Sequence, residues 1–188
     1  MRYTLPILAA MSLAACSSET PTAEQTPAEP MATETMGAAP AASGDMPTDG
    51  AGYVAMAGAS DLYEIQSSEL ALEKSQNENV RQFAERMVSD HRSTTEQITS
   101  AASEAGLNAA PPQLTPMQQD MMSELQAASG DAFDQAYIQQ QRQAHEMALG
   151  LHRNFAENGD TAQLQQVANE AVPVIEQHAT ELADMNVG

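Results

Sequence analysis

Residues 78–104 read ENVRQFAERMVSDHRSTTEQITSAASE. Apolar and small side chains recur in this stretch every three or four residues, which is the spacing of one face of an α-helix. The face has a histidine at its centre and consists of Val80, Ala84, Met87, His91, Thr95, Ile98 and Ala102. The pattern predicts a long helix that buries one side, and Gly106 together with Pro111 and Pro112 predicts its end.

The flanking sequence repeats this pattern and predicts an all-α fold. Further long helices are expected over residues 54–74, 131–157 and 160–185, with Asp160 as the cap of the last one. Pro173 is expected to kink that helix, because proline removes a backbone donor. A short helix is expected over residues 115–128, with Thr115 as its N-cap and Pro116 at its first position. Four long helices with short connections predict an antiparallel four-helix bundle, in which the extra short helix lies between the second and third long helices.

The first fifty residues predict an export signal and a tether rather than part of the fold. Residues 1–15 have one positive charge followed by an apolar stretch that is too short to span a bilayer, as in a signal peptide. The box Leu13-Ala14-Ala15-Cys16 resembles a bacterial lipoprotein cleavage site, so Cys16 is the predicted lipidation site. The alternative is an ordinary secretory signal with a chance cysteine. Residues 16–50 are rich in Pro, Ala and Thr, have no basic residue and predict a disordered acidic tether, so the helical domain is expected over residues 51–188.

This organisation predicts an outer-membrane lipoprotein that faces the periplasm and contacts the membrane through its lipid. Ser17 follows the cysteine, where an Asp would have resembled an inner-membrane retention signal. The composition excludes a nucleic-acid partner, because 26 Asp and Glu against 7 Lys and Arg give a net charge of −19 and no basic face for phosphates. The sequence identifies no protein partner.

The predicted buried faces contain one acid and three histidines, one from each long helix. His91, His145 and His178 lie among apolar residues at helical spacing, and Glu64 lies among small residues. An unpaired carboxylate is costly to bury, so Glu64 requires a partner if it lies inside. The pattern therefore predicts that Glu64, His91, His145 and His178 converge and bind a transition metal, with Zn, Cu, Ni and Fe as candidates. Asp90 is expected either to support a ligand or to face solvent.

Two other interpretations of these residues remain open at this point. The acid and histidines can satisfy one another by hydrogen bonds and specify helix packing without any metal, in a non-catalytic structural or interaction module. An iron-oxidising enzyme is disfavoured, because the Glu-x-x-His pairs of di-iron bundles are missing. The fourth histidine, His152, is expected to be structural or exposed, and the residues three positions before the four histidines are Val88, Arg142, Leu149 and Ile175. The sequence also contains no other catalytic motif.

The domain resembles a bacterial family of unknown function, domain-of-unknown-function family 4142. The matching segments are Glu64 with Leu70-Ala71, residues 79–84, residues 87–91, Phe133-Asp134 with Tyr137, His145, and Pro173 with His178. The resemblance implies a ferritin-like four-helix bundle that is often secreted or lipid-anchored, and the family's recurrent acid and histidines fall on Glu64, His91, His145 and His178. Ala144 departs from the pattern, since the family often has an Asp there. The resemblance implies no activity, so a role in metal handling or stress tolerance stays a hypothesis.

Overall fold

The computed structural model describes residues 46–185, and within this range the chain forms five α-helices and no strand. The helices are α1 (Gly50–Lys74), α2 (Glu78–Glu104), α3 (Pro116–Ala127), α4 (Asp131–Asn158) and α5 (Ala162–Asp184). This confirms the all-α prediction. The predicted signal peptide, Cys16 and most of the predicted tether lie outside the described residues. None of the described helices is both long enough and apolar enough to cross a membrane.

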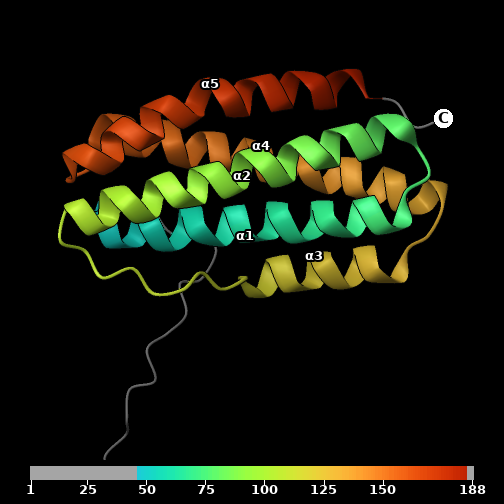
Figure 1. Ribbon diagram of the computed structural model, residues 1–188, viewed down its shortest axis with the longest axis horizontal. Helices are drawn as coiled ribbons and strands as arrows, with labels where there is room; N and C mark the ends of the chain where they lie inside the picture. Colours follow the sequence, from blue (N-terminus) through green and yellow to red (C-terminus); the bar gives the residue numbers. More distant parts are fainter. Residues whose placement is uncertain (1–45, 186–188) are drawn as a thin grey trace, which may run out of the picture. The chain divides into compact units, whose positions relative to one another are not determined.

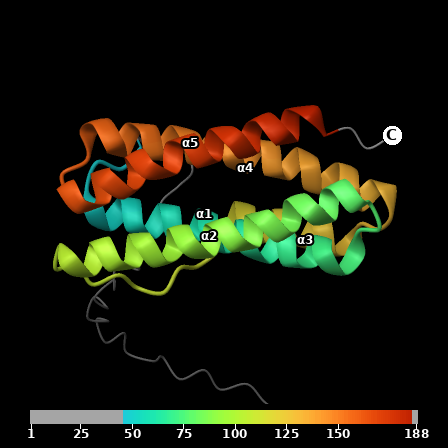
Figure 2. The same cartoon turned by 45° about the horizontal axis from the view of Figure 1, so that its top comes forward.

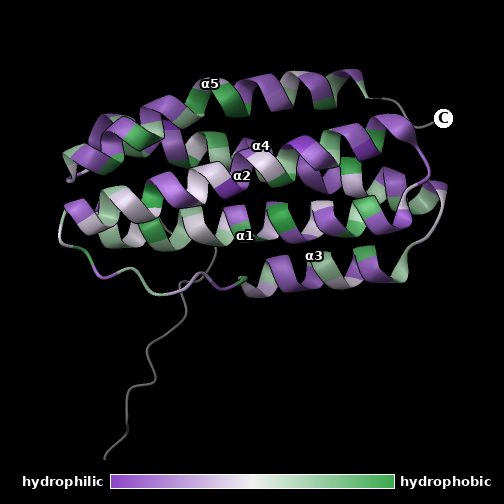
Figure 3. Cartoon of the chain, viewed as in Figure 1, coloured by the Kyte–Doolittle hydropathy of each residue, from purple (hydrophilic) through white to green (hydrophobic). Residues whose placement is uncertain are grey.

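The four long helices pack around a common core, and α3 lies outside them. α1 packs against α2 and α4, α5 packs against α4 and α2, and α3 contacts α1 and α4. α2 and α4 run opposite to α1 and α5 (Figure 1). A second view shows α5 beside α4 and α1 beside α2 (Figure 2). Hydrophilic residues recur along every helix between hydrophobic ones, as expected of helices that bury one face (Figure 3).

Local sequence signals explain most of the helix ends. Thr115 forms a capping box with Gln118 and precedes Pro116, which is the predicted start of α3. α2 ends as predicted, because Gly106 adopts a positive φ of 74° that a residue with a Cβ rarely tolerates. α1 begins at Gly50, four residues earlier than predicted, because the Asp49 side chain accepts a hydrogen bond from the Gly52 amide.

The predicted capping role of Asp160 is wrong. The N-cap of α5 is Thr161, and it makes no side-chain capping bond. Asp160 instead accepts a hydrogen bond from the Gly50 amide at 2.9 Å, so it satisfies a free donor in the first turn of α1. The carboxylate therefore fastens the start of α1 to the connection between α4 and α5. Pro173 lies within α5, and the helix continues past it to Asp184.

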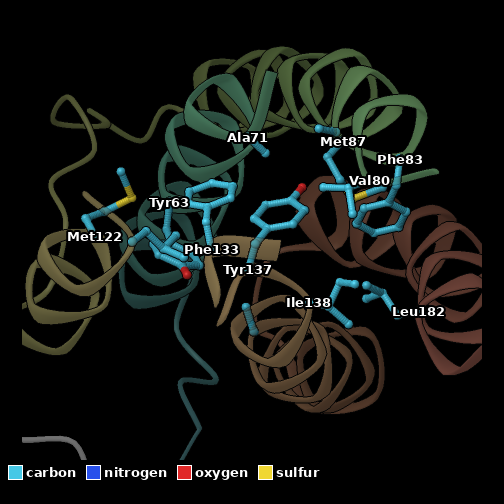
Figure 4. Packing of buried hydrophobic residues seen from close by; sticks show 13 residues of the cluster. Tyr63, Ala71, Val80, Phe83, Met87, Met122, Phe133, Tyr137, Ile138 and Leu182 are labelled. Atoms are coloured by element: carbon cyan, nitrogen blue, oxygen red, sulfur yellow. The ribbon is translucent and has the colours of Figure 1, made fainter. Parts of the chain in front are cut away.

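Apolar clusters occupy both ends of the helical core. At one end, aromatic rings from α1, α2 and α4 interdigitate with aliphatic residues, and Tyr63, Phe83, Phe133 and Tyr137 are fully buried (Figure 4). At the other end, Tyr53 stacks on Phe155 with ring centroids 4.0 Å apart. The core also contains buried polar residues, which include Glu64 and the four histidines.

A candidate metal centre

Three histidines from three different helices form a tight triangle in the core. The ring centroids of His91 and His145 are 5.9 Å apart, those of His91 and His178 are 5.9 Å apart, and those of His145 and His178 are 5.4 Å apart. The three residues are at most 5 % exposed. One nitrogen of each ring can be chosen so that all three atoms lie within 4.8 Å of one another.

Each imidazole is oriented by an acceptor that bonds one of its ring nitrogens. His91 Nδ1 lies 2.8 Å from Asp61 Oδ1, His145 Nδ1 lies 2.8 Å from the Gln141 carbonyl oxygen, and His178 Nε2 lies 3.0 Å from Asp90 Oδ2. Because a carboxylate or carbonyl oxygen can only accept, these contacts assign the N–H of each neutral ring to that nitrogen. The remaining nitrogens are His91 Nε2, His145 Nε2 and His178 Nδ1, and each presents a lone pair when its ring is neutral.

Two of these remaining nitrogens have the spacing that a shared cation requires. His145 Nε2 and His178 Nδ1 are 3.4 Å apart. Two nitrogens bound at about 2.0–2.1 Å to a tetrahedral metal lie about 3.3 Å apart, so this pair matches the geometry without rearrangement. Two nitrogens that both present lone pairs cannot form a hydrogen bond with each other at this distance. A cation between them would replace this repulsion with attraction to both nitrogens. An outer acceptor that holds the other ring nitrogen is also the usual arrangement around metal-bound histidine.

Glu64 from α1 completes the cluster. Its carboxylate is fully buried, and Oε1 lies 3.5 Å from His145 Nδ1. Neither oxygen makes a hydrogen bond of standard geometry, and His91 Nε2 likewise has no partner within the described part of the chain. Burial raises the pKa of Glu64 to about 7, although the charge of His91 and the nearby Gln141 amide act in the opposite direction. The cluster therefore contains a costly carboxylate and an unbonded imidazole nitrogen side by side.

Burial and neighbouring charges shift the three histidines in different directions. Burial lowers the pKa of His145 to about 3 and also lowers the pKa of His178, in which the bond to Asp90 acts in the opposite direction. Burial alone would lower the pKa of His91 as well, but the hydrogen bond to Asp61 and the charge of Glu64 outweigh it and the pKa is raised. His145 and His178 are therefore neutral at pH 7, as metal ligands must be.

The structure thus brings His91, His145 and His178 into one group. Glu64 of α1, the fourth predicted ligand, lies beside it, with Oε1 3.5 Å from His145 Nδ1. Asp90 Oδ2 contacts His178 Nε2 while the Asp90 side chain is 37 % exposed, so which of its two predicted roles applies stays a prediction. The fourth histidine, His152, lies apart from the triangle; it is buried and Tyr53 Oη is 3.0 Å from its Nδ1. Whether the four predicted residues bind a metal stays a prediction.

Sequence reasoning missed Asp61, which is part of the same cluster. Asp61 is 3 % exposed, and besides the bond to His91 it accepts a hydrogen bond from Thr95 Oγ1 at 2.9 Å. It precedes Glu64 by one helical turn, so the two acids share a face of α1. The spacing of three residues between Asp61 and Glu64, which places two acids on one face of α1, is the sequence signal that could have identified Asp61.

Comparison of the sequence with known protein families identifies the family of the chain. The sequence model of DUF4142, a domain of unknown function, matches residues 35–185. The chain belongs to the DUF4142 family. The comparison of this DUF4142 chain with curated proteins gives no match.

Solved structures of low sequence identity share the fold of the DUF4142 chain. A DUF305 protein from Streptomyces coelicolor has a TM-score of 0.62 at 16 % identity, over 72 % of this chain and 90 % of its own. CopM in its Cu(II)-bound form has a TM-score of 0.61 at 15 % identity, over 72 % of this chain and 93 % of its own. CopM in its silver-bound form has a TM-score of 0.60 at 15 % identity, with the same coverage. At these identities the likeness establishes the helical fold alone.

Proposed function

We propose that this protein binds a transition-metal ion through His91, His145 and His178, with Glu64 as the fourth ligand. The observation that carries the proposal is the set of buried atoms that have no hydrogen-bond partner within the described residues: His91 Nε2 and both oxygens of Glu64. A buried polar network that only specifies packing satisfies its own donors and acceptors, because each unpaired group costs about 1–3 kcal/mol. A bound cation would satisfy the imidazole nitrogen and the carboxylate together.

The donor set favours copper or zinc and also accommodates nickel or Fe²⁺. Three imidazole nitrogens and one carboxylate suit these borderline metals, and Cu²⁺ binds most tightly among the common divalent ions of the first transition series. The fold is shared with CopM, which has been solved with Cu(II), Cu(I) and silver bound. Copper is therefore the first metal to test. A role in metal handling or stress tolerance follows from such a site, and the missing Glu-x-x-His pairs argue against ferroxidase activity.

The sequence supports a location for this function. In our proposal the four long helices form a ferritin-like antiparallel bundle, which a tether connects to a lipid on Cys16. The domain would then face the periplasm from the outer membrane. Palmitate labelling of the full-length chain in a bacterial host, with Cys16→Ser as the control, tests the anchor. Label in the wild-type chain alone supports it, and equal labelling of the two chains or no label overturns it.

Metal content and thermal stability test the metal site. The full chain carrying Cys16→Ser, which removes a competing thiol, is expected to retain about one equivalent of metal and to unfold at higher temperature with Cu²⁺ or Zn²⁺. A thousandfold excess over the dissociation constant adds about 4 kcal/mol of stability. His145→Gln and His178→Gln should lose this effect. Leu125→Val, a change at a fully buried position on α3, should keep it.

Two results would overturn the metal proposal. One is the absence of bound metal together with no thermal shift for Cu²⁺, Zn²⁺, Ni²⁺ and Fe²⁺. The other is a shift of wild-type size in whichever histidine variant remains folded by circular dichroism, since a ligand cannot be removed without weakening the site.

A further inference from the structure

A small cavity lies beside the histidine triangle. Its volume is about 10 Å³, and its walls come from α1, α2, α4 and α5. This is room for about one water molecule. Two of the triangle's rings, those of His91 and His178, form part of the wall, whereas His145 and Glu64 do not. The cavity therefore reaches the cluster from one side only.

Side-chain exposure changes steeply across this cavity. Val174 on α5 is 40 % exposed, and the Asp90 side chain on α2 is 37 % exposed. Both residues line the same cavity as His91 and His178, which are at most 5 % exposed. The wall of the cavity thus combines exposed residues of α2 and α5 with two of the proposed ligands.

The opposite side of the cluster is closed by packed side chains. Glu64 is fully buried and His145 is 1 % exposed. The ring of Phe83, also fully buried, has its centroid 6.2 Å from that of His145 and 6.3 Å from that of His178. Interiors packed in this way leave no room for an ion without repacking of the core. On the cavity side there is free volume, about 10 Å³, next to His91 and His178.

The charge along the cavity favours a cation. Asp61 and Asp90 belong to its wall, and no lysine or arginine does among the residues described. Asp61 is buried with both oxygens engaged, by His91 and Thr95. Of the two acids, Asp90 is therefore the one whose carboxylate is exposed to solvent. A carboxylate at the mouth of a low-dielectric opening raises the local concentration of cations and their association rate.

We propose that this cavity is the route by which a divalent transition-metal ion reaches the histidines. Asp90 attracts the ion at the outer end, and Val174 restricts the opening. The inference rests on the proposed metal site and adds the path and the residues that control the rate of binding. Val174 is the cleaner probe of the route, because it lines the cavity and is not one of the proposed ligands.

Stopped-flow absorbance of Cu²⁺ binding to the full chain carrying Cys16→Ser tests the route. Asp90→Asn keeps an oxygen that accepts from His178 Nε2 but removes the charge. It should slow association about threefold to tenfold at low salt, and the difference should shrink as salt is added. Glu96→Gln, an exposed change of the same charge on the same helix, is the control and should bind at the wild-type rate.

The size of the opening is varied separately. Val174→Ala should speed association, and Val174→Phe should slow it, with little change in the equilibrium affinity of either variant. Val172→Ala, on the same helix and outside the cavity wall, is the control. The route is refuted if both Val174 variants associate at the wild-type rate, or if Glu96→Gln slows binding as much as Asp90→Asn. Failure of the metal site itself is a different outcome, because the wild-type chain would then take up no Cu²⁺ at equilibrium.

Discussion

Replacement of Glu64 by Gln is expected to stabilise the metal-free protein while weakening its metal site. The Glu64 carboxylate is fully buried, and burial raises its pKa from 4.5 to about 7. The folded state therefore resists ionisation more than the unfolded chain does, so stability is lost as the pH rises through this range. Because a tenfold change in an ionisation constant is worth about 1.4 kcal/mol, the loss is about 1 kcal/mol at pH 5 and about 3 kcal/mol at pH 8.

Urea unfolding of the metal-free chain at pH 5 and pH 8 measures this difference. Gln has nearly the same shape and no charge, so the advantage of Glu64→Gln over the wild type should grow by about 2 kcal/mol between the two pH values. With metal present, the same variant should gain less stability than the wild type, because it has lost a ligand charge. A residue that weakens stability but supports binding is expected at a functional site.

The control for this experiment is Glu73→Gln, at an exposed position on the same helix, which should show no growing difference between pH 5 and pH 8. The reasoning fails if the advantage of Glu64→Gln is the same at both pH values. It also fails if the variant is less stable than the wild type at pH 8, because the carboxylate would then be contributing to the metal-free fold.

Two further predictions concern residues outside the proposed ligand set. Burial lowers the pKa of His152 to about 4, so stability is lost as the pH falls from about 6.5 to about 4, by about 3 kcal/mol in total. His152→Gln should remove that part of the acid sensitivity in urea unfolding at pH 4 and pH 7, and an unchanged slope would contradict it. Asp160→Ala should cost about 1 kcal/mol of thermal stability, since it leaves the Gly50 amide without its acceptor. Asp131→Ala, in the exposed first turn of α4, is its comparison, and equal losses would argue against a specific role for the Gly50 contact.

The helices were predictable because their signals are local. The limits predicted for α2 agree with the structure at both ends, since the hydrophobic stripe and the break after Glu104 lie within the segment itself. Asp160 was misassigned because an acid just before a helix usually caps it, whereas here its carboxylate accepts a hydrogen bond from the Gly50 amide, 110 residues away. No local pattern reports a partner at that separation.

The residues of the candidate site could be predicted from the sequence, but the hydrogen bonds that orient them could not. One polar residue on the buried face of each long helix was enough to expect convergence of Glu64 with the three histidines. The acceptor that orients His91 was not predictable, because Asp61 lies on another helix and the contact between them is set by helix rotation and register. Those quantities depend on how the helices pack and are not encoded in the spacing along one helix.

The arrangement of one polar residue per helix also constrains the order of folding. Glu64 and His178 are separated by most of the folded chain, and a chain without α5 lacks one side of the triangle. Contacts this distant in sequence form late, because the entropy of closing the intervening loop must be overcome first. In partly folded chains the three histidines are therefore far apart, and each binds metal only weakly. A tight metal complex of this protein would consequently be a marker of completed folding, and metal would stabilise the finished structure rather than direct its assembly.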